Sequence, residues 1–231
     1  MSRLASFKGP SAPSQSPIRA QLPSNPSSPS RPTESTFHRK ARTLLREIDN
    51  VTQTWDELVL IDGMRAAQSL VDTRTELDNE LTTLPTGSLP PVGTVYLRIQ
   101  LMEKRLTDLN ALLSKLQRQF DKMVNLVDGM EALVFEAHKT KGWKWVHEEP
   151  LWCTWTLEKF ATELPSILPA YQREMVELTE LVDGLRSHDT PFERSRDILA
   201  KWVAQPHTRT KGWSEWEDLC SVEVERWDSN K

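Results

Sequence analysis

"VYLRIQLMEKRLTDLNALLSKLQRQFDKMVNLVDGMEALVFEA", residues 95–137, has apolar residues at strictly alternating spacings of four and three. The positions are Val95, Ile99, Met102, Leu106, Leu109, Leu113, Leu116, Phe120, Met123, Val127, Met130, Val134 and Ala137. This heptad spacing is typical of a helix that packs one apolar seam against another helix. Such a helix would span on the order of 60 Å at 1.5 Å per residue. Lys139, Lys141 and Gly142 supply a cationic last turn and a glycine, which predict that the helix ends there.

A second, shorter heptad pattern lies N-terminal to the first. Its positions are Phe37, Ala41, Leu44, Ile48, Val51, Trp55 and Leu58. The pattern loosens around Asp62-Gly63, where the glycine predicts a kink, and an irregular apolar face continues to Leu84. "PTGSLPP", residues 85–91, then stops the helix and turns the chain. Two heptad helices joined by a short breaker predict an antiparallel hairpin, with residues 112–137 beside residues 37–58.

The hairpin seam is wider than two helices require. Trp55 is bulky for such a seam, and Leu112, Leu126 and Leu133 broaden the apolar stripe of the second helix. We therefore expect a third helical element to cover this part of the hairpin.

The C-terminal part of the chain can supply that cover. Apolar residues from Leu157 to Leu185 lie near helical spacing. "TPFE", residues 190–193, predicts a new helix with Thr190 as its N-cap, Pro191 at its first position and Glu193 completing a capping box, and Pro206 ends it. The last stretch, "KGWSEWEDLCSVEVERW", is compatible with one more short helix.

These patterns predict an all-α protein in three parts. Residues 1–36 form a disordered Ser/Pro-rich tail, because the segment has too little apolar surface to offset its ordering entropy. Residues 37–142 form a long antiparallel coiled-coil hairpin. Residues 143–231 form a smaller, Trp-rich helical bundle that packs on the hairpin end.

The tail contains the pattern Ser-Pro-x-Arg twice, at residues 16–19 and 28–31. A proline after the target serine and a basic residue two places later are the preference of cyclin-dependent kinases, so Ser16 and Ser28 are phosphorylation candidates. Ser-Pro pairs are also common in any Ser/Pro-rich segment. The tail carries four basic residues and one acidic residue, a net charge of +3. Phosphates would reverse that charge.

Composition excludes several classes of function. The whole chain has a formal charge of −4, so the part after the tail carries −7, which argues against direct binding of nucleic acid. The sequence has no run of 18 apolar residues and no apolar segment near Met1, so we expect no membrane span and no secretory signal. Cys153 and Cys220 are far apart, which favours a reduced intracellular protein.

The sequence offers no convincing reaction centre. His138, His147 and Cys153 lack a familiar metal-ligand spacing, and no phosphate-binding glycine loop is present. We therefore expect no enzyme activity and no cofactor, and we assign no catalytic, cofactor-binding or metal-binding residue. One alternative stays open, in which Cys153 is a nucleophile and His147 its base, although no residue is identified for an oxyanion hole.

Tryptophans cluster in "KGWKWVHEEPLWCTW", residues 141–155, at Trp143, Trp145, Trp152 and Trp155. Aromatic side chains at this density can form a binding hot spot, or they can fasten an irregular connector to the bundle. Trp202, on the predicted inner face of the last helix, is a further candidate. We list all five tryptophans as candidate partner contacts.

Residues 148–208 resemble the cyclin-dependent-kinase-2-interacting protein family. The resemblance rests on Pro150-Leu151, Trp152, Thr154-Trp155, Phe160, Tyr171, Glu174, His188, Leu199, Trp202, Gln205 and Pro206. A weaker similarity around Trp55 and Leu58 extends back to about Arg39.

The resemblance implies a non-enzymatic helical adaptor in the nucleus, with the cytoplasm as a second location. Its expected partners are a cyclin-dependent kinase, a Cdc7-type kinase and the subunits of an AAA-ATPase assembly. Its expected processes are DNA replication, checkpoint signalling and ribosome maturation. The chain would then be one subunit of a hetero-complex, with no direct contact to nucleic acid or membrane. The alternative is a structural coiled-coil tether or kinetochore-type component, in which the heptads pair between two copies.

Overall fold

The computed structural model describes residues 34–85, 88–187, 189–208, 218 and 221–223. The described helices all belong to one unit of the chain, which begins at Ser35. Within the described residues the secondary structure is helical, apart from an isolated β-bridge between Pro150 and Thr156. The all-α prediction is therefore confirmed.

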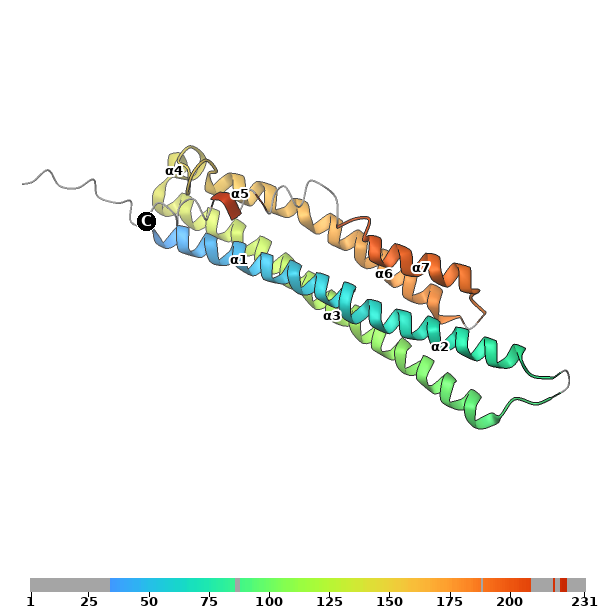
Figure 1. Cartoon of the computed structure of the whole chain (residues 1–231). Helices are drawn as coiled ribbons and strands as arrows, with labels where there is room; N and C mark the ends of the chain where they lie inside the picture. The colour runs from blue at the N-terminus through green and yellow to red at the C-terminus, as the bar shows by residue number, and fades with distance from the viewer. Residues whose placement is uncertain (1–33, 86–87, 188, 209–217, 219–220, 224–231) are drawn as a thin grey trace, which may run out of the picture. The chain divides into compact units, whose positions relative to one another are not determined.

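A long helical hairpin forms the larger part of this unit (Figure 1). One arm consists of α1 (Thr36–Glu57), a π-helical turn η1 (Leu58–Gly63) and α2 (Met64–Thr82). The other arm is α3 (Val92–Lys141), a single helix of 50 residues. The N-terminus of α1 is capped by Ser35, whose hydroxyl accepts a hydrogen bond from the backbone N–H of His38.

Ion pairs between the arms fix their direction and register. Lys40 pairs with Glu136 at 2.7 Å, and Lys122 pairs with Glu47 at 3.0 Å. Residue numbers that increase along α1 are therefore matched by residue numbers that decrease along α3, as in an antiparallel hairpin. The predicted pairing of residues 37–58 with residues 112–137 is confirmed. These exposed pairs contribute little to stability, and the apolar seam between the arms provides the packing.

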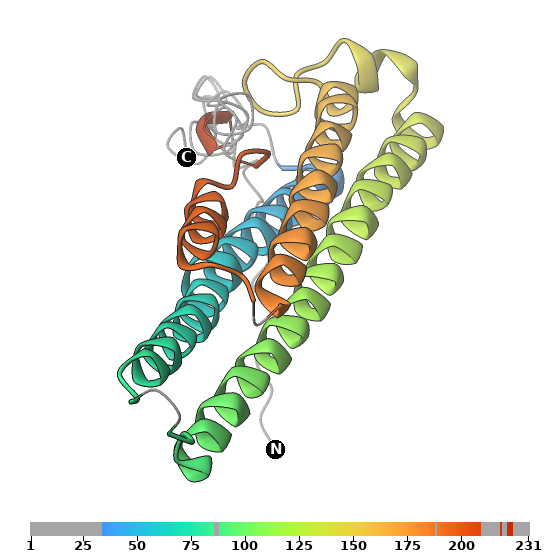
Figure 2. The same ribbon diagram turned by 90° about the vertical axis from the view of Figure 1, so that its right-hand side faces the viewer.

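The predicted seam of α3 is buried over most of its length. Its buried residues are Met102, Leu106, Leu109, Leu112, Leu116, Met123, Val127, Met130, Leu133 and Ala137. Leu112 and Leu133, which widen the predicted stripe, belong to this set. Near the start of α3 the seam opens, and Ile99 is 40% exposed. The helices that cover the rest of the hairpin do not extend over this end in either view (Figures 1 and 2).

Two positions of the α1 stripe differ from the heptad prediction. Leu45 is buried and Leu44 only half-buried, because Leu44 lies at the edge of the seam, over Gly129 of α3. At the end of the stripe Val59 is buried and Leu58 half-buried.

The predicted kink at Gly63 is a π-helical turn in the structure. A Cβ atom at Gly63 would lie 2.6 Å from Cδ2 of Leu112 and 2.7 Å from Cζ2 of Trp202. Glycine is therefore required here because two core side chains approach the backbone closely, and not because the helix ends. A π-helical turn inside an α-helix often marks such a specialised position.

The C-terminal helices form a third layer along the hairpin. They are α4 (Trp143–His147), α5 (Leu157–Glu163), the 3₁₀ turn η2 (Leu164–Ile167), α6 (Leu168–Arg186) and α7 (Phe192–Ala204). Figure 2 shows α6 beside α3, with α7 on the other side of α6, over α2. Tyr171 of α6 packs edge-on against Trp55 at 5.1 Å, so the third element expected from the bulk of Trp55 is present. The layer extends past the middle of both arms, because Arg74 of α2 donates a hydrogen bond to the carbonyl of Leu185 and Arg186 donates one to Asn110 of α3, and this is further than packing at one end would place it.

The start of α7 differs from the prediction. Pro191 is its N-cap, and no side chain caps the helix, so Thr190 is not the N-cap. The hydroxyl of Thr190 instead donates a hydrogen bond of 3.0 Å to the carbonyl of Gly184 in the last turn of α6. Thr190 thus satisfies a free carbonyl at the end of one helix and leaves the start of the next uncapped. The short helix considered after Pro206 lies mostly outside the described residues.

Candidate functional site

Four of the five candidate tryptophans lie where the chain leaves α3 and turns towards α5. Gly142 ends α3 with a φ of 86°, a conformation that glycine adopts without steric cost. The short helix α4 and a connector, residues 148–156, follow it. We call residues 143–156 the Trp-rich end, and Figure 1 places it at the opposite end of α3 from the hairpin loop.

Three tryptophans of the Trp-rich end fasten the connector to the body. Trp145 is half-buried, with its ring 5.6 Å from Phe37 of α1. Trp152 is 6% exposed and packs edge-on against Phe160 of α5 at 5.4 Å. Trp155 is half-buried, and the centroid of its ring also lies 5.1 Å from that of Phe160. For these three tryptophans, the contacts favour the interpretation that they fasten the connector to the bundle.

Trp143 is different, because its side chain faces solvent. It is 58% exposed, and its ring stacks on His147 at 4.7 Å with an interplanar angle of 21°. The stacking holds a large aromatic surface in place while leaving its other face free. Trp143 is therefore the tryptophan of this region that a partner could reach without any opening of the fold.

Trp202 lies away from the Trp-rich end, in the core of the bundle. Its side chain is fully buried, and its Nε1–H donates a hydrogen bond of 2.9 Å to the backbone carbonyl of Val59 in η1. A partner could contact this ring only if α7 left the hairpin. The hypothesis of a partner contact therefore does not extend to Trp202.

Two histidines and a carboxylate form a chain of polar contacts at the Trp-rich end. Nε2 of His138 lies 2.8 Å from Nε2 of His147, and Nδ1 of His147 lies 2.5 Å from a carboxylate oxygen of Glu158. Both ring nitrogens of His147 are thus engaged, so His147 does not act on the thiol of Cys153 in this structure. Among the described residues no group of three or more His, Cys, Asp or Glu side chains could hold a metal ion.

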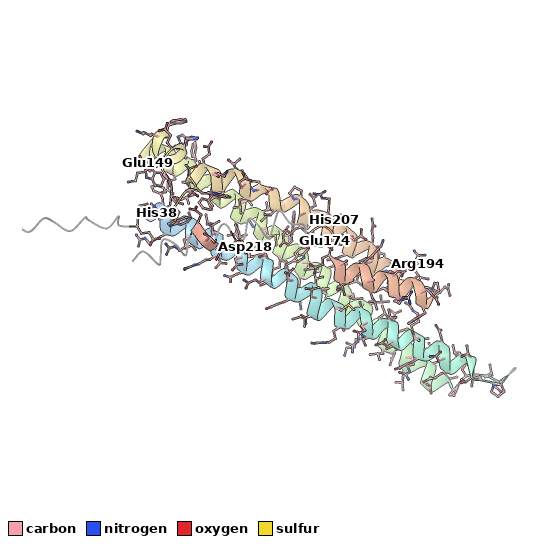
Figure 3. The ribbon with its side chains drawn as sticks, turned by 45° about the horizontal axis from the view of Figure 1, so that its top comes forward. His38, Glu149, Glu174, Arg194, His207 and Asp218 are labelled. Carbon is pink, nitrogen blue, oxygen red and sulfur yellow. The ribbon has the colours of Figure 1, made fainter. Side chains whose placement is uncertain are left out.

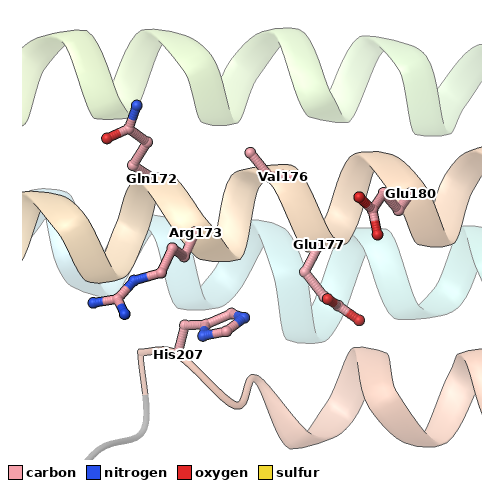
Figure 4. A pocket seen from close by; sticks show the side chains of 6 residues that line it. All are labelled: Gln172, Arg173, Val176, Glu177, Glu180 and His207. Atoms are coloured by element: carbon pink, nitrogen blue, oxygen red, sulfur yellow. The ribbon is translucent and has the colours of Figure 1, made fainter.

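A shallow hollow of about 380 Å³ lies between α6 and the segment after α7. Its lining residues are Gln172, Arg173, Val176, Glu177, Glu180 and His207 (Figure 4). In Figure 4 the ring of His207 lies between the side chains of Arg173 and Glu177. The hollow is open and mixed in charge, and no described group in it is arranged for acid–base or nucleophilic chemistry.

A buried carboxylate on α6 anchors the segment that borders this hollow. Glu174 is fully buried, and it accepts a hydrogen bond of 3.0 Å from the backbone N–H of His207 (Figure 3). Burial raises the pKa of Glu174, and hydrogen bonds from the backbone of His207 and Thr208 offset only part of this effect. Glu174 therefore ties the end of the α7 segment to α6, which is a structural role.

The hairpin loop end carries an exposed apolar surface that the sequence prediction missed. Its members, by exposed fraction, are Leu89 at 91%, Val92 at 81%, Leu97 at 65%, Tyr96 at 59% and Leu81 at 39%. We call these five residues the apolar tip. The signal was present in the sequence, because the seventeen residues from Leu81 to Leu97 include no Asp, Glu, Lys, Arg or His. Of the five residues of the apolar tip only Leu89 lies outside the helices, because Leu81 belongs to the last turn of α2, and Val92, Tyr96 and Leu97 belong to the first turns of α3.

The remaining candidates lie in the tail. Ser16 and Ser28 are outside the described residues. None of the described helices is long and apolar enough to cross a membrane.

The chain matches no protein-family model and no curated protein. Membership of the cyclin-dependent-kinase-2-interacting protein family therefore stays a hypothesis, which rests on the residues between Glu148 and Thr208.

Proposed function

We propose that this protein is a non-enzymatic adaptor that binds its partners through the apolar tip and the Trp-rich end. The apolar tip is the observation that supports the proposal best. Large apolar side chains that are exposed together and free of charge are a mark of a protein-binding surface. The arms of the hairpin extend past α6 and α7 at this end (Figures 1 and 2), so the tip is accessible from several sides.

The charges beside the apolar tip indicate the kind of partner. Arg98 pairs with Glu80 at 3.0 Å and also with Glu76, one turn earlier on α2. The hydrogen bond to Glu80 is the main cause of a raised pKa of Arg98. The positive charge of Arg98 is therefore paired within this cluster of three side chains. The cluster has a net charge of −1, and no cation in it is left unpaired. We infer a partner protein with an apolar groove and a weakly basic rim, because an anionic membrane surface would require cations on the tip.

The resemblance of residues 148–208 supports a more specific role. In the proposal, the adaptor links a cyclin-dependent kinase and a Cdc7-type kinase with an AAA-ATPase assembly in the nucleus. It would serve DNA replication, checkpoint signalling and ribosome maturation as one subunit of a hetero-complex. Three residues that support the resemblance are in contact, because Trp152 and Trp155 of the Trp-rich end both pack on Phe160 of α5.

Affinity purification of the tagged full chain tests both the docking surface and the partner classes of the proposal. The tip variant combines Leu89→Ser, Val92→Gln and Leu97→Gln, which all change exposed residues. The matched control combines Phe135→Gln and Val176→Gln, two apolar residues that are 64% and 55% exposed away from the tip. We expect wild type and control to recover a cyclin-dependent kinase, a Cdc7-type kinase or AAA-ATPase subunits, and the tip variant to lose them.

Two results would count against the proposal in different ways. Recovery of none of these partner classes with wild type would contradict the specific role. Equal recovery with the tip variant would show that the apolar tip is not the docking surface.

The same purified protein tests the phosphorylation hypothesis. If a cyclin-dependent kinase is a partner, mass spectrometry should find phosphate on Ser16 and Ser28, and a kinase inhibitor should remove it. Absence of phosphate on both residues during active growth would contradict this part of the proposal.

A further inference from the structure

The connector of the Trp-rich end wraps around a carboxylate that comes from the far end of the sequence. Glu223 accepts hydrogen bonds from three successive backbone N–H groups of the connector. Cys153 donates to Oε2 at 3.0 Å, Thr154 to Oε1 at 3.1 Å and to Oε2 at 3.0 Å, and Trp155 to Oε2 at 3.5 Å. The hydroxyl of Thr154 also donates to Oε1. Successive N–H groups that converge in this way form an anion-binding concavity.

The concavity is held in shape by contacts that do not involve Glu223. The β-bridge between Pro150 and Thr156 closes the base of the loop, and the N–H of Leu151 donates to the carbonyl of Trp155 at 2.7 Å. The side chains of Trp152 and Trp155 both pack on Phe160. The loop would therefore keep its converging donors if the carboxylate left.

The carboxylate is suited to this position as an anion. The side chain of Glu223 is 5% exposed. Burial alone would raise its pKa, but hydrogen bonds from the side chain and backbone of Thr154, and from the backbone of Cys153 and Trp155, outweigh burial and lower it. The donors are partly buried, and they would lose charge-assisted hydrogen bonds if the carboxylate left, so the loop favours an occupied state. Thr154 is exposed, so solvent or another chain can reach the concavity when it is empty.

We propose that residues 151–155 form a binding site for the carboxylate of an acidic peptide, which the chain's own C-terminal segment fills through Glu223. An acidic segment of a partner protein binds there by displacing Glu223, so the site couples partner binding to release of the C-terminal segment. This site lies within the Trp-rich end but away from the apolar tip, and it is inferred from the contacts of Glu223 and not from the proposed kinase and ATPase partners.

Hydrogen exchange in the full chain tests the internal contact. Glu223→Gln keeps the size of the side chain but replaces one carboxylate oxygen with a donor that faces the backbone donors. We expect the amides of residues 153–155 to exchange at least tenfold faster in this variant than in wild type. Glu149→Gln, an exposed residue of the same connector, is the matched control and should leave their exchange unchanged (Figure 3). Unchanged exchange in Glu223→Gln would overturn the proposal.

A peptide binding experiment tests the site itself. The probe is a labelled peptide of residues 214–228 with Cys220→Ser, and its partner probe adds Glu223→Gln. We expect the first peptide to bind the full-length Glu223→Gln chain at least tenfold more tightly than it binds wild type, whose site is occupied. We also expect it to bind that variant at least tenfold more tightly than the second peptide does. Equal binding of the two peptides to the variant would overturn the proposal.

A second variant covers the case in which Glu223→Gln disturbs folding. Thr154→Val removes one donor and keeps the shape of an exposed residue, so its circular dichroism should match that of wild type. We expect severalfold faster exchange at Cys153 and Trp155 in this variant. Exchange at the wild-type rate would count against the site even if the first variant could not be studied.

Discussion

The indole Nε1–H of Trp202 donates a hydrogen bond of 2.9 Å to the backbone carbonyl of Val59, 143 positions earlier in the chain. Val59 lies in the π-helical turn η1, where its carbonyl also accepts the N–H of Met64, five residues later. The turn ends at Gly63, whose missing side chain leaves room for the same indole ring. A local departure from α-helical geometry and a glycine together form the slot into which α7 inserts its tryptophan.

We predict that Gly63→Ala destabilises the protein although alanine is the better helix former. Alanine would gain about 1 kcal/mol of helix propensity. Its Cβ atom, however, would lie 2.6 Å from Cδ2 of Leu112 and 2.7 Å from Cζ2 of Trp202. Overpacking of this kind costs about 1–3 kcal/mol, so we expect the free energy of unfolding in urea to fall by up to about 2 kcal/mol.

Gly93→Ala is the matched control for that experiment. It lies in the first turn of α3, and a Cβ atom there would meet nothing within 4 Å. Its free energy of unfolding should be equal to that of wild type or higher. A Gly63→Ala protein as stable as the Gly93→Ala protein would show that the slot is not tightly packed.

We predict that Trp202→Phe lowers stability more than the same change at Trp143. Trp202→Phe removes the hydrogen bond to Val59, and it leaves part of a fully buried slot empty. The two losses together should cost about 1–3 kcal/mol. Trp143→Phe alters a ring that is 58% exposed and should stay within about 0.5 kcal/mol of wild type. Equal effects on the melting temperature would contradict the assigned roles.

We predict that the contribution of Glu174 to stability falls as pH rises. Burial raises the pKa of Glu174 in the folded chain above the ordinary value of about 4.3 for the unfolded chain. The folded state therefore favours the protonated form, and its advantage is complete below about pH 4.3 and is lost as pH rises through the folded pKa.

Glu174→Gln replaces this group by a neutral side chain of the same shape. The stability of wild type relative to this variant should decrease as pH rises from about 4 to about 7. Glu180→Gln, on the exposed face of the same helix, should show no such trend. Urea unfolding at several pH values would measure both differences, and a constant difference for Glu174→Gln would contradict the prediction.

We predict that the isolated protein is a monomer. The apolar seams of both arms are buried within one chain, and Lys40 and Glu136 pair across the arms of the same hairpin. A tether built on heptads that pair between copies would need these seams for a second molecule. Size-exclusion chromatography with light scattering should give the mass of one chain, 26.6 kDa, at micromolar concentration. A mass of two chains would favour the tether.

The sequence predicted the hairpin because its information is periodic and local. Strict spacing identified the seam of α3, and three prolines with a glycine identified the turn. The second half of the other arm did not follow from heptad counting, because η1 adds one residue to the helical repeat. The buried stripe of α2 is therefore displaced by about one position from a continuation of the α1 heptads. Its residues include Ala67, Leu70, Arg74 and Leu77. One residue corresponds to about 100° of helical rotation, which explains why the pattern looked irregular.

The candidate site was only partly predictable. Tryptophan density drew attention to the Trp-rich end, but density does not separate exposed Trp143 from buried Trp152. The contact between Thr154 and Glu223 spans 69 residues and involves backbone N–H groups, which have no sequence signature. The burial of Glu174 could not be predicted from the sequence either, because a glutamate on a helix is usually exposed to solvent.

The 50 residues of α3 form one uninterrupted helix, which at 1.5 Å per residue is about 75 Å long. The apolar tip lies at its first turns, and the Trp-rich end follows its last turn. In the proposal that both surfaces bind partners, α3 would keep the two partners about 75 Å apart, so that both could be bound at the same time.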